Sequence, residues 1–187
     1  MEEKYQKYID LLNKWQSKIN LVSSTTLSEA YKRHIKDSIE LGNYIKDKTV
    51  KIYDLGAGGG FPGLPLAIEG YSNINLVESD VRKCAFMQQV KIAYSLKSTN
   101  ILNKRVERID DIADVITCRA FSSLLNIFDL SSGMRSKDTE YILLKGENIK
   151  QEIKEAETKY LFDYDIVDSS VYSSVKIVII KNVRLHV

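Results

Sequence analysis

The hydrophobic positions near the amino terminus recur at steps of three and four residues, the spacing of one face of an α-helix. These positions are Tyr5, Ile9, Leu12, Trp15 and Ile19. This pattern predicts an amphipathic helix. A second helix is predicted from Thr26 to Ile39, because Glu29 lies three positions after Thr26 and completes a capping box.

From residue 49 onward, short apolar runs alternate with stretches of helical spacing. The runs that predict buried strands are 50–53, 74–77, 100–102, 115–117 and 141–144. The stretches that predict helices are 62–69, 81–96, 122–130 and 147–159. This alternation is typical of an α/β protein with a mostly parallel sheet and helices on both faces. Residues 161–167 and 175–183 are two further apolar runs with no helix between them, which predicts a terminal antiparallel hairpin.

The length of 187 residues suits one domain with a short extension. We therefore expect residues 1–48 to form an N-terminal helical extension and residues 49–187 the main domain, the two together making one compact unit.

Composition narrows the class of protein. Hydrophobic residues make up 44% and charged residues 28%, as in a soluble globular protein. No apolar run approaches the ~18 to 20 residues of a membrane span, and the amino terminus lacks a signal-like apolar core, so a cytoplasmic location is expected. Two cysteines, Cys84 and Cys118, and two histidines give no metal-ligand spacing, so we expect no metal site and two buried thiols. The net charge of +2 leaves any nucleic-acid footprint to local clusters.

The segment 54–66 has an unusual composition, because it holds five of the nine glycines and both prolines. A strand, a glycine-rich loop and a helix in this order let the backbone approach a nucleoside ligand. The dinucleotide pattern requires glycine where this chain has Phe61, so a pyrophosphate ligand is disfavoured. Asp54 would repel a phosphate but suits an ammonium group, and Glu78 at the end of the next strand suits ribose hydroxyls. S-adenosylmethionine carries both groups; the alternative is that the two carboxylates are merely polar strand ends.

At this point the sequence resembles a known family along nearly its whole length. The glycine segment, DLGAGGGFPGLPLA, resembles the cofactor loop of the RsmG (GidB) family of bacterial 16S ribosomal RNA guanine-N7 methyltransferases. Further matches follow in order: Trp15 with Asn20-Leu21, Arg33-His34 with Asp37-Ser38, Glu78-Ser79 with Arg82-Lys83 and Phe86, Arg105-Val106-Glu107, Arg119-Ala120, and Leu144-Lys145-Gly146.

This resemblance implies a class I methyltransferase, a Rossmann-like α/β fold that uses S-adenosylmethionine to methylate a guanine in the 530 loop of 16S ribosomal RNA. The residues expected at the cofactor are Asp54, Gly56, Gly58, Phe61, Glu78, Val106, Glu107 and Arg119, with Val106 and Glu107 beside the adenine and Arg119 beside the methyl donor. The expected partner is the small ribosomal subunit or an assembly intermediate of it, and the protein is expected to be a monomer.

The end of the fourth predicted strand reads Thr117-Cys118-Arg119-Ala120, without the prolines typical of exocyclic-amine methyltransferases. Guanine N7 has an in-plane lone pair and no proton to remove, so positioning supplies most of the catalysis and we predict no essential general base. Arg119 is the candidate on the substrate side, through a phosphate or the guanine O6. Its alternative role is to brace the strand end by pairing with a carboxylate.

Basic clusters give weaker candidates for RNA contact. They are Arg33, His34, Lys36, Arg82, Lys83 and Lys145. A lone helical histidine such as His34 is more often structural, Lys145 is as well explained by solvation, and Arg82 with Lys83 fits a solvated helix face.

Three functions remain open on the sequence alone. They are the RNA methyltransferase, a nicotinamide-dependent oxidoreductase, and a protein that binds S-adenosylmethionine but methylates a protein or a small molecule, or catalyses nothing. Phe61 argues against the oxidoreductase. Only a substrate test separates the first function from the third.

Overall fold

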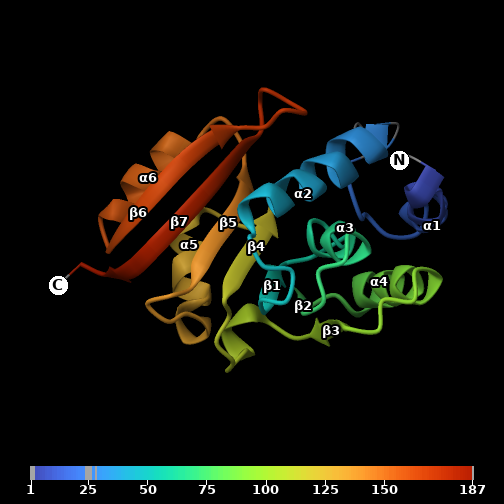
Figure 1. Cartoon of the computed structure of the whole chain (residues 1–187), viewed down its shortest axis with the longest axis horizontal. Helices are drawn as coiled ribbons and strands as arrows, with labels where there is room; N and C mark the ends of the chain where they lie inside the picture. The colour runs from blue at the N-terminus through green and yellow to red at the C-terminus, as the bar shows by residue number, and fades with distance from the viewer. Residues whose placement is uncertain (1–2, 24–26, 28, 187) are drawn as a thin grey trace.

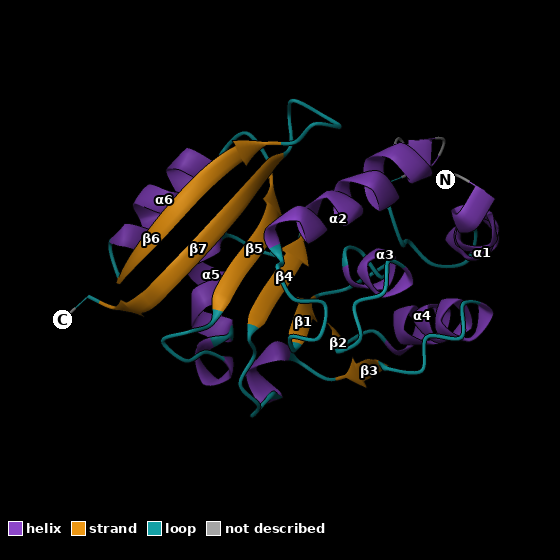
Figure 2. Ribbon diagram, in the orientation of Figure 1, coloured by secondary structure: helices purple, strands orange, loops and turns teal. Residues whose placement is uncertain are grey.

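The computed structural model describes residues 3–23, 27 and 29–186. A seven-stranded sheet with the strand order β3-β2-β1-β4-β5-β7-β6 runs through the molecule (Figures 1 and 2). The strands are β1 Ile52–Leu55, β2 Ile74–Glu78, β3 Thr99–Asn103, β4 Val115–Arg119, β5 Glu140–Lys145, β6 Tyr160–Asp168 and β7 Lys176–Leu185. The helices of the main domain are α3 Gly63–Ile68, α4 Val81–Ala93, α5 Leu124–Leu130 and α6 Ile149–Glu157, with 3-10 turns η5 Val106–Arg108 and η6 Ser132–Met134.

Strands β1 to β5 pair in parallel, whereas β7 is antiparallel to both β5 and β6. The predicted α/β fold, a mostly parallel sheet that ends in an antiparallel hairpin, is confirmed. In the described part of the chain, no helix combines the length and the apolar character needed to cross a membrane.

Two hydrophobic clusters cover the opposite faces of the sheet. Because side chains alternate along a strand, Ile142 and Leu144 of β5 join one cluster while Tyr141 and Leu143 join the other. The first cluster lies beneath α1, α3 and α4, and the second beneath α5 and α6. Fully buried strands of this kind read as continuous apolar runs, which is why the sequence located them.

The N-terminal segment contains η1 Glu3–Tyr5, α1 Gln6–Gln16, the π-helical turn η3 Tyr31–Lys36, α2 Asp37–Glu40 and the 3-10 turn η4 Leu41–Tyr44. Tyr5, Tyr8 and Leu12 are fully buried in the same cluster as residues of α3 and α4. Helix α1 packs against α4 (Figure 1). The predicted capping box at Thr26 lies outside the described residues, and the division of the chain at residue 48 stays a prediction.

Helix α4 ends at Ala93, three residues before the predicted end. Ser95 adopts a left-handed backbone with φ +54°, and the Leu96 N–H donates to the Lys91 carbonyl. This closing bond satisfies a carbonyl of the last helical turn. No glycine or proline marks the position, so the sequence pattern gave no sign of it.

The first strand is tied to the helix that follows it by a buried carboxylate. Asp54 is fully buried, and its Oδ2 accepts a hydrogen bond from the Gly63 N–H at 2.8 Å. This bond joins β1 to the first turn of α3 across the glycine loop. Burial raises the pKa of Asp54 to about 8.

The raised pKa makes stability depend on pH in a direction that Asp54→Asn tests. Between pH 4 and 8 the native protein retains a proton on Asp54 that the unfolded chain has released, so the free energy of unfolding falls as pH rises. From pH 5 to 8 this fall amounts to on the order of 3 kcal/mol. Asparagine keeps the acceptor for Gly63 and cannot ionise, so urea denaturation of Asp54→Asn should show a smaller fall over that range.

The control for this measurement is Asp138→Asn, a change in an exposed loop, which should follow the wild type. Parallel curves of unfolding free energy against pH for the wild type and Asp54→Asn would contradict the assignment.

Candidate functional site

The glycine loop follows β1 at the edge of the sheet where the parallel strands end. Gly56 and Gly58 have left-handed backbones, with φ of +62° and +55°. A Cβ on Gly56 would lie 2.2 Å from the Phe121 ring, whereas a Cβ on Gly58 would have only the Gly56 carbonyl oxygen nearby, at 3.7 Å. The loop therefore requires glycine at the first position and presents bare backbone at the second.

The Glu78 carboxylate holds this loop from the neighbouring strand β2. Its Oε2 accepts a hydrogen bond from the Gly58 N–H at 3.0 Å, and its Oε1 accepts one from the Asp80 N–H at 2.9 Å. Both oxygens are fixed by backbone donors, and each has a further lone pair for a ligand. Glu78 thus combines a structural role with a position on a cavity wall.

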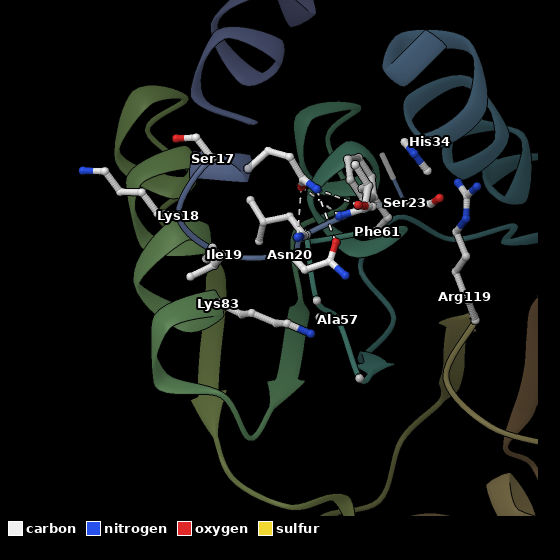
Figure 3. Close-up of a pocket in the computed structure, with 17 residues that line it drawn as sticks. Ser17, Lys18, Ile19, Asn20, Ser23, His34, Ala57, Phe61, Lys83 and Arg119 are labelled. Carbon is white, nitrogen blue, oxygen red and sulfur yellow. Dashed lines mark hydrogen bonds between the residues drawn. The ribbon is translucent and has the colours of Figure 1, made fainter. Parts of the chain in front are cut away.

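Two cavities lie on either side of the loop and share Gly56, Lys83 and Ala120 as lining residues. The smaller, of about 440 Å³, is bounded by the ends of β2 and β3 and includes Glu78, Val106 and Glu107. The larger, of about 960 Å³, lies between the loop and the N-terminal segment (Figure 3). We refer to them as the β2 cavity and the N-terminal cavity.

The charges on the two cavities differ. Lys18, Lys83 and Arg119 line the N-terminal cavity, and no described residue of its lining is acidic. Figure 3 shows Lys83 reaching from α4 toward the loop and Arg119 extending from the end of β4 toward His34. The β2 cavity carries Glu78 and Glu107 in addition to three basic residues, Lys83, Lys104 and Arg105. The N-terminal cavity therefore favours anionic ligand groups.

The segment after α1 forms a wall of the N-terminal cavity because a glutamine side chain organises it. Gln16 Oε1 accepts hydrogen bonds from the N–H groups of Leu21 and Val22, and its Nε2 donates to the Val22 carbonyl at 2.7 Å. Asn20 and Ser23 of the same segment also line the cavity. Asn20 and Leu21 were among the family matches, but no sequence pattern showed that they line a cavity.

Three stacked rings join the N-terminal segment to the glycine loop. The Phe61 ring lies between those of Tyr8 and His34, with ring centroids 5.2 Å away on each side. The Tyr8 hydroxyl also donates to the Gly59 carbonyl. Tyr8 shares a helix face with Tyr5, Leu12 and Ile19, so its burial, but not its bond to the loop, follows from helical spacing.

His34 lines the N-terminal cavity as a neutral ring. Burial, together with the nearby charges of Arg119 and Arg33, lowers its pKa to about 3. A proton acceptor with so low a pKa is weak at neutral pH. The position of His34 against Phe61 favours the structural interpretation of this residue.

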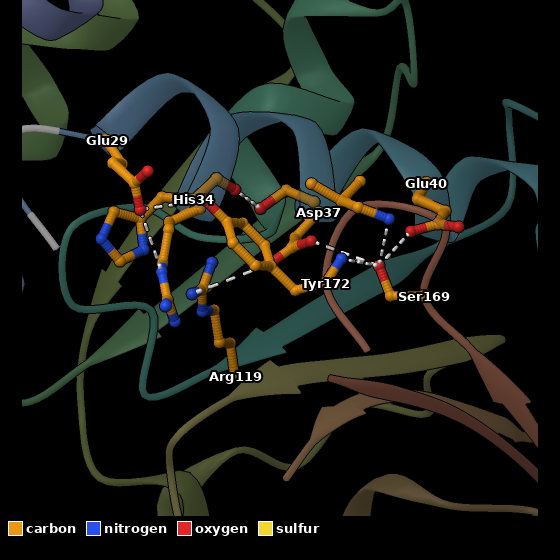
Figure 4. Close-up of polar contacts among 10 residues, drawn as sticks. Glu29, His34, Asp37, Glu40, Arg119, Ser169 and Tyr172 are labelled. Carbon is orange, nitrogen blue, oxygen red and sulfur yellow. Dashed lines mark hydrogen bonds and ion pairs between the residues drawn. The ribbon is translucent and has the colours of Figure 1, made fainter. Parts of the chain in front are cut away.

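Arg119 belongs to a buried polar network that reaches the tip of the terminal hairpin (Figure 4). Its Nη2 lies 4.0 Å from Asp37 Oδ2, and its buried Nη1 forms no hydrogen bond with the described residues. Ser169, at the end of β6, donates to Glu40 at 2.6 Å and contacts Asp37 at 3.3 Å. Burial raises the pKa of Asp37 to about 6, against the opposing effect of Arg119. Arg119 is thus braced by a carboxylate, and it keeps one buried donor without a partner among the described residues.

Ala120 adopts a left-handed backbone, with φ +49°, immediately after Arg119. This conformation is uncommon for a residue with a side chain and often marks a functional site. Ala120 lines both cavities, so the turn places backbone where the two cavities meet.

The remaining candidates for RNA contact are scattered. Arg33 lies over the Tyr172 ring at 4.4 Å, and the exposed Arg82 pairs with Asp80 at 2.9 Å. Lys36 is exposed on η3. Lys145 is buried and donates to Glu152 and to the Ser122 carbonyl, so simple solvation does not describe it. Of the six candidates, only His34 and Lys83 line the N-terminal cavity.

All but one of the residues predicted to bind the cofactor line the two cavities. Gly56, Gly58, Phe61, Glu78, Val106, Glu107 and Arg119 line one or both cavities. Asp54 does not, because its carboxylate is fully buried beneath α3. Cys84 and Cys118 are buried free thiols, and within residues 3–23, 27 and 29–186 no group of three or more metal-ligating side chains occurs.

Solved structures of similar fold support the topology. The ribosomal protein L11 methylase from Lactobacillus delbrueckii subsp. bulgaricus has a TM-score of 0.65 and 12% identity, covering 80% of this chain and 79% of that one. TYW2 from M. jannaschii, in complex with AdoMet, has a TM-score of 0.60 and 14% identity, covering 91% of this chain and 80% of that one. At these identities the likeness concerns the fold.

Two sequence relatives have a much higher identity to this chain than these solved structures have. Ribosomal RNA small subunit methyltransferase G from Rickettsia typhi is 40% identical over 92% of this chain and 90% of its own length, and the protein of that name from Rickettsia prowazekii is 39% identical over 96% and 93%. The family model GidB, described as rRNA small subunit methyltransferase G, matches residues 1–178. The resemblance seen in the sequence is confirmed, and the chain belongs to the GidB family of rRNA small subunit methyltransferases.

Proposed function

We propose that this protein transfers a methyl group from S-adenosylmethionine to N7 of a guanine in the 530 loop of 16S ribosomal RNA, as a monomer in the cytoplasm. The observation that carries the proposal is the junction at Gly56, Lys83 and Ala120, where a cavity bearing the Glu78 carboxylate meets a cavity lined by cations. Membership of the GidB family supports the choice of ribosomal RNA over other acceptors.

The residues present fit S-adenosylmethionine. In the β2 cavity, Glu78 would accept hydrogen bonds from the ribose hydroxyls, and Val106 with Glu107 would flank the adenine. The bare backbone at Gly58 leaves room beside the loop for the amino-acid part of the ligand, and the cations of the N-terminal cavity suit its carboxylate. The predicted contact of Asp54 with the ammonium group finds no support, since that carboxylate is enclosed.

When bound, S-adenosylmethionine supplies a methyl carbon on a cationic sulfur, which keeps the S–C electron pair as the guanine N7 lone pair forms the new N–C bond. No proton leaves the guanine in this reaction. The protein's part is then to orient the acceptor and to exclude water. The neutral His34 and Cys118, whose pKa burial raises to about 12, suit a site that does not depend on proton transfer.

Charge supports a polyanionic acceptor. Lys18 is exposed in the lining of the N-terminal cavity, while Arg119 lies deeper, and no described residue pairs with its Nη1. Such cations bind backbone phosphates or a base carbonyl. The cofactor carboxylate would occupy one of these cations, so the others favour an anionic acceptor such as RNA over a neutral small molecule.

Methyl transfer to small subunits tests the proposal directly. Subunits purified from a bacterium that lacks this gene, incubated with labelled S-adenosylmethionine, should take up label at one guanine of the 530 loop, mapped by reduction and strand scission. Gly58→Asp should abolish uptake, because aspartate tolerates the left-handed backbone but places a carboxylate beside the ligand. Label on subunit proteins, or none on RNA while the cofactor still binds, would reject the RNA assignment.

Glu78→Gln tests the cofactor site apart from catalysis. Loss of the charged acceptor should weaken the binding of S-adenosylhomocysteine, measured by calorimetry, by roughly tenfold or more, since hydrogen bonds to a charged group contribute ~1.5 to 3 kcal/mol each. Glu147→Gln, an exposed change after β5, serves as the matched control. Equal affinities for the two variants would remove Glu78 from the binding site.

The absence of a general base predicts the pH dependence. Under single-turnover conditions the rate should not rise between pH 6.5 and 8.5, because the pKa of His34 lies near 3 and that of Cys118 near 12. Asp54 has a pKa of about 8, but it is fully buried and lines neither cavity, so it cannot reach the acceptor. A catalytic base that titrated in this range would produce a rising limb of the pH profile. A rising limb that disappears on substitution of a single residue would show that such a base exists.

A further inference from the structure

A third, smaller cavity of about 240 Å³ opens beside the junction of the first two. Arg119 and Ala120 line it from the end of β4, Lys145 and Gly146 from the end of β5, and Glu152 from α6. Arg119 and Ala120 also line the N-terminal cavity. The third cavity, which we call the β5 cavity, therefore adjoins the place where the methyl donor would lie.

A buried ion pair forms the floor of the β5 cavity. Lys145 Nζ lies 2.6 Å from Glu152 Oε2 and 2.7 Å from the Ser122 carbonyl oxygen, and its side chain is only 6% exposed. The same Oε2 accepts a hydrogen bond from the Leu124 N–H at 2.8 Å. One oxygen of Glu152 is thus committed to the protein, and the side chain cannot swing away without breaking both bonds.

The second oxygen of Glu152 has different surroundings. Within the described part of the chain, Oε1 forms no hydrogen bond, and the side chain remains 24% exposed. Glu152 lines the β5 cavity and also a neighbouring cavity of about 470 Å³, which Glu155 lines as well. A carboxylate held through one oxygen presents the other as a fixed acceptor. Its chemical complement is a ligand edge with N–H donors.

We propose that the β5 cavity receives the target guanine and that Glu152 Oε1 accepts hydrogen bonds from its N1–H and N2 amino group. This inference rests on the proposed function. Those donors lie on the Watson–Crick edge, whereas N7 lies on the opposite, Hoogsteen edge. Enzymes that modify a base commonly bind it out of the stack and hydrogen-bond its Watson–Crick edge. Contact with Glu152 therefore identifies guanine and leaves its N7 unobstructed.

The same contact explains how other bases would be rejected. Adenine presents the N1 lone pair at the position where guanine has N1–H, so it would bring an acceptor against the fixed carboxylate oxygen. A buried acceptor left without its donor costs ~1 to 3 kcal/mol, more when it is charged. Arg119 lines the same cavity, and its side chain, which is 19% exposed, is available for the guanine O6 or a phosphate.

Gly146 offers a way to block the β5 cavity without disturbing the empty protein. A Cβ built on Gly146 has no atom within 4 Å, and its backbone is not left-handed. A larger side chain at this position would occupy space beside the cavity rather than collide with the protein. Gly146→Val should therefore leave folding unchanged and hinder entry of a base.

The test compares guanine with inosine, which lacks the N2 amino group, at the target position of otherwise identical reconstituted small subunits. The readout is the dissociation constant of the subunit from protein loaded with S-adenosylhomocysteine, measured by filter binding. The wild type should bind the guanine subunit roughly tenfold more tightly. Glu152→Ala should bind both subunits with equal, weakened affinity, whereas a merely structural Glu152 would leave the guanine-to-inosine ratio unchanged.

Two further variants and a methylation assay of the wild type distinguish failure of the Glu152 assignment from failure of the proposed function. Glu155→Gln, one turn along α6, changes a carboxylate of the neighbouring cavity but not of the β5 cavity, so it should keep the wild-type ratio. Gly146→Val should lose affinity for both subunits, with an unchanged melting temperature and unchanged binding of S-adenosylhomocysteine. A wild-type ratio near one, or a wild-type ratio in Glu152→Ala, would overturn the assignment of Glu152 even where methyl transfer to the 530 loop occurs. Failure of the wild type to methylate any subunit RNA would instead reject the proposed function.

Discussion

The hydrogen bond from the Gly63 N–H to the buried Asp54 carboxylate is the constraint on which the site depends. It fixes the distance between the end of β1 and the start of α3, so the ten residues from Asp54 to Gly63 must follow one path. Glu78 then holds the middle of that path through the Gly58 N–H. Because the carboxyl group of Asp54 joins the two ends of the loop and that of Glu78 holds its centre, the bare backbone faces the cavities in a defined shape. Preorganisation of this kind lowers the entropic cost of ordering a loop on binding.

The N-terminal segment is part of the site rather than an accessory to it. Tyr8 bonds to the glycine loop and stacks on Phe61, and Gln16 shapes the wall that faces them. Two of the three cations in the N-terminal cavity come from outside the sheet, Lys18 from the segment after α1 and Lys83 from α4. The nucleoside side of the site is built by the sheet, and the anion-binding side is built largely by the helices around it.

The sequence alone predicted the elements that a short stretch of residues identifies by its hydrophobic pattern or its composition. The apolar runs of β1, β2, β4 and β5 are buried on both faces, and the glycine loop stands out by composition. Asp54 was predicted to contact the cofactor, but it is enclosed beneath α3, because no sequence pattern tells whether a carboxylate at a strand end points into a cavity or beneath the next helix. For Lys145 the sequence left open a phosphate contact or simple solvation. It did not show the ion pair, because the partner Glu152 lies seven residues further on, in the helix that follows β5. Tyr8, Gln16 and Ala120 were missed since their roles depend on tertiary contacts and on backbone angles.

The network around Arg119 affects the order in which the parts of the protein fold. Asp37, which braces Arg119, is itself contacted by Ser169, 132 residues later in the chain. Glu40 bonds to the Ser170 N–H as well as to the Ser169 hydroxyl. Contacts so distant in sequence form late, because the intervening chain must first be brought together. A growing polypeptide on the ribosome can thus form the glycine loop and its helices early, yet the arginine beside the acceptor is not fully braced until the terminal hairpin has emerged.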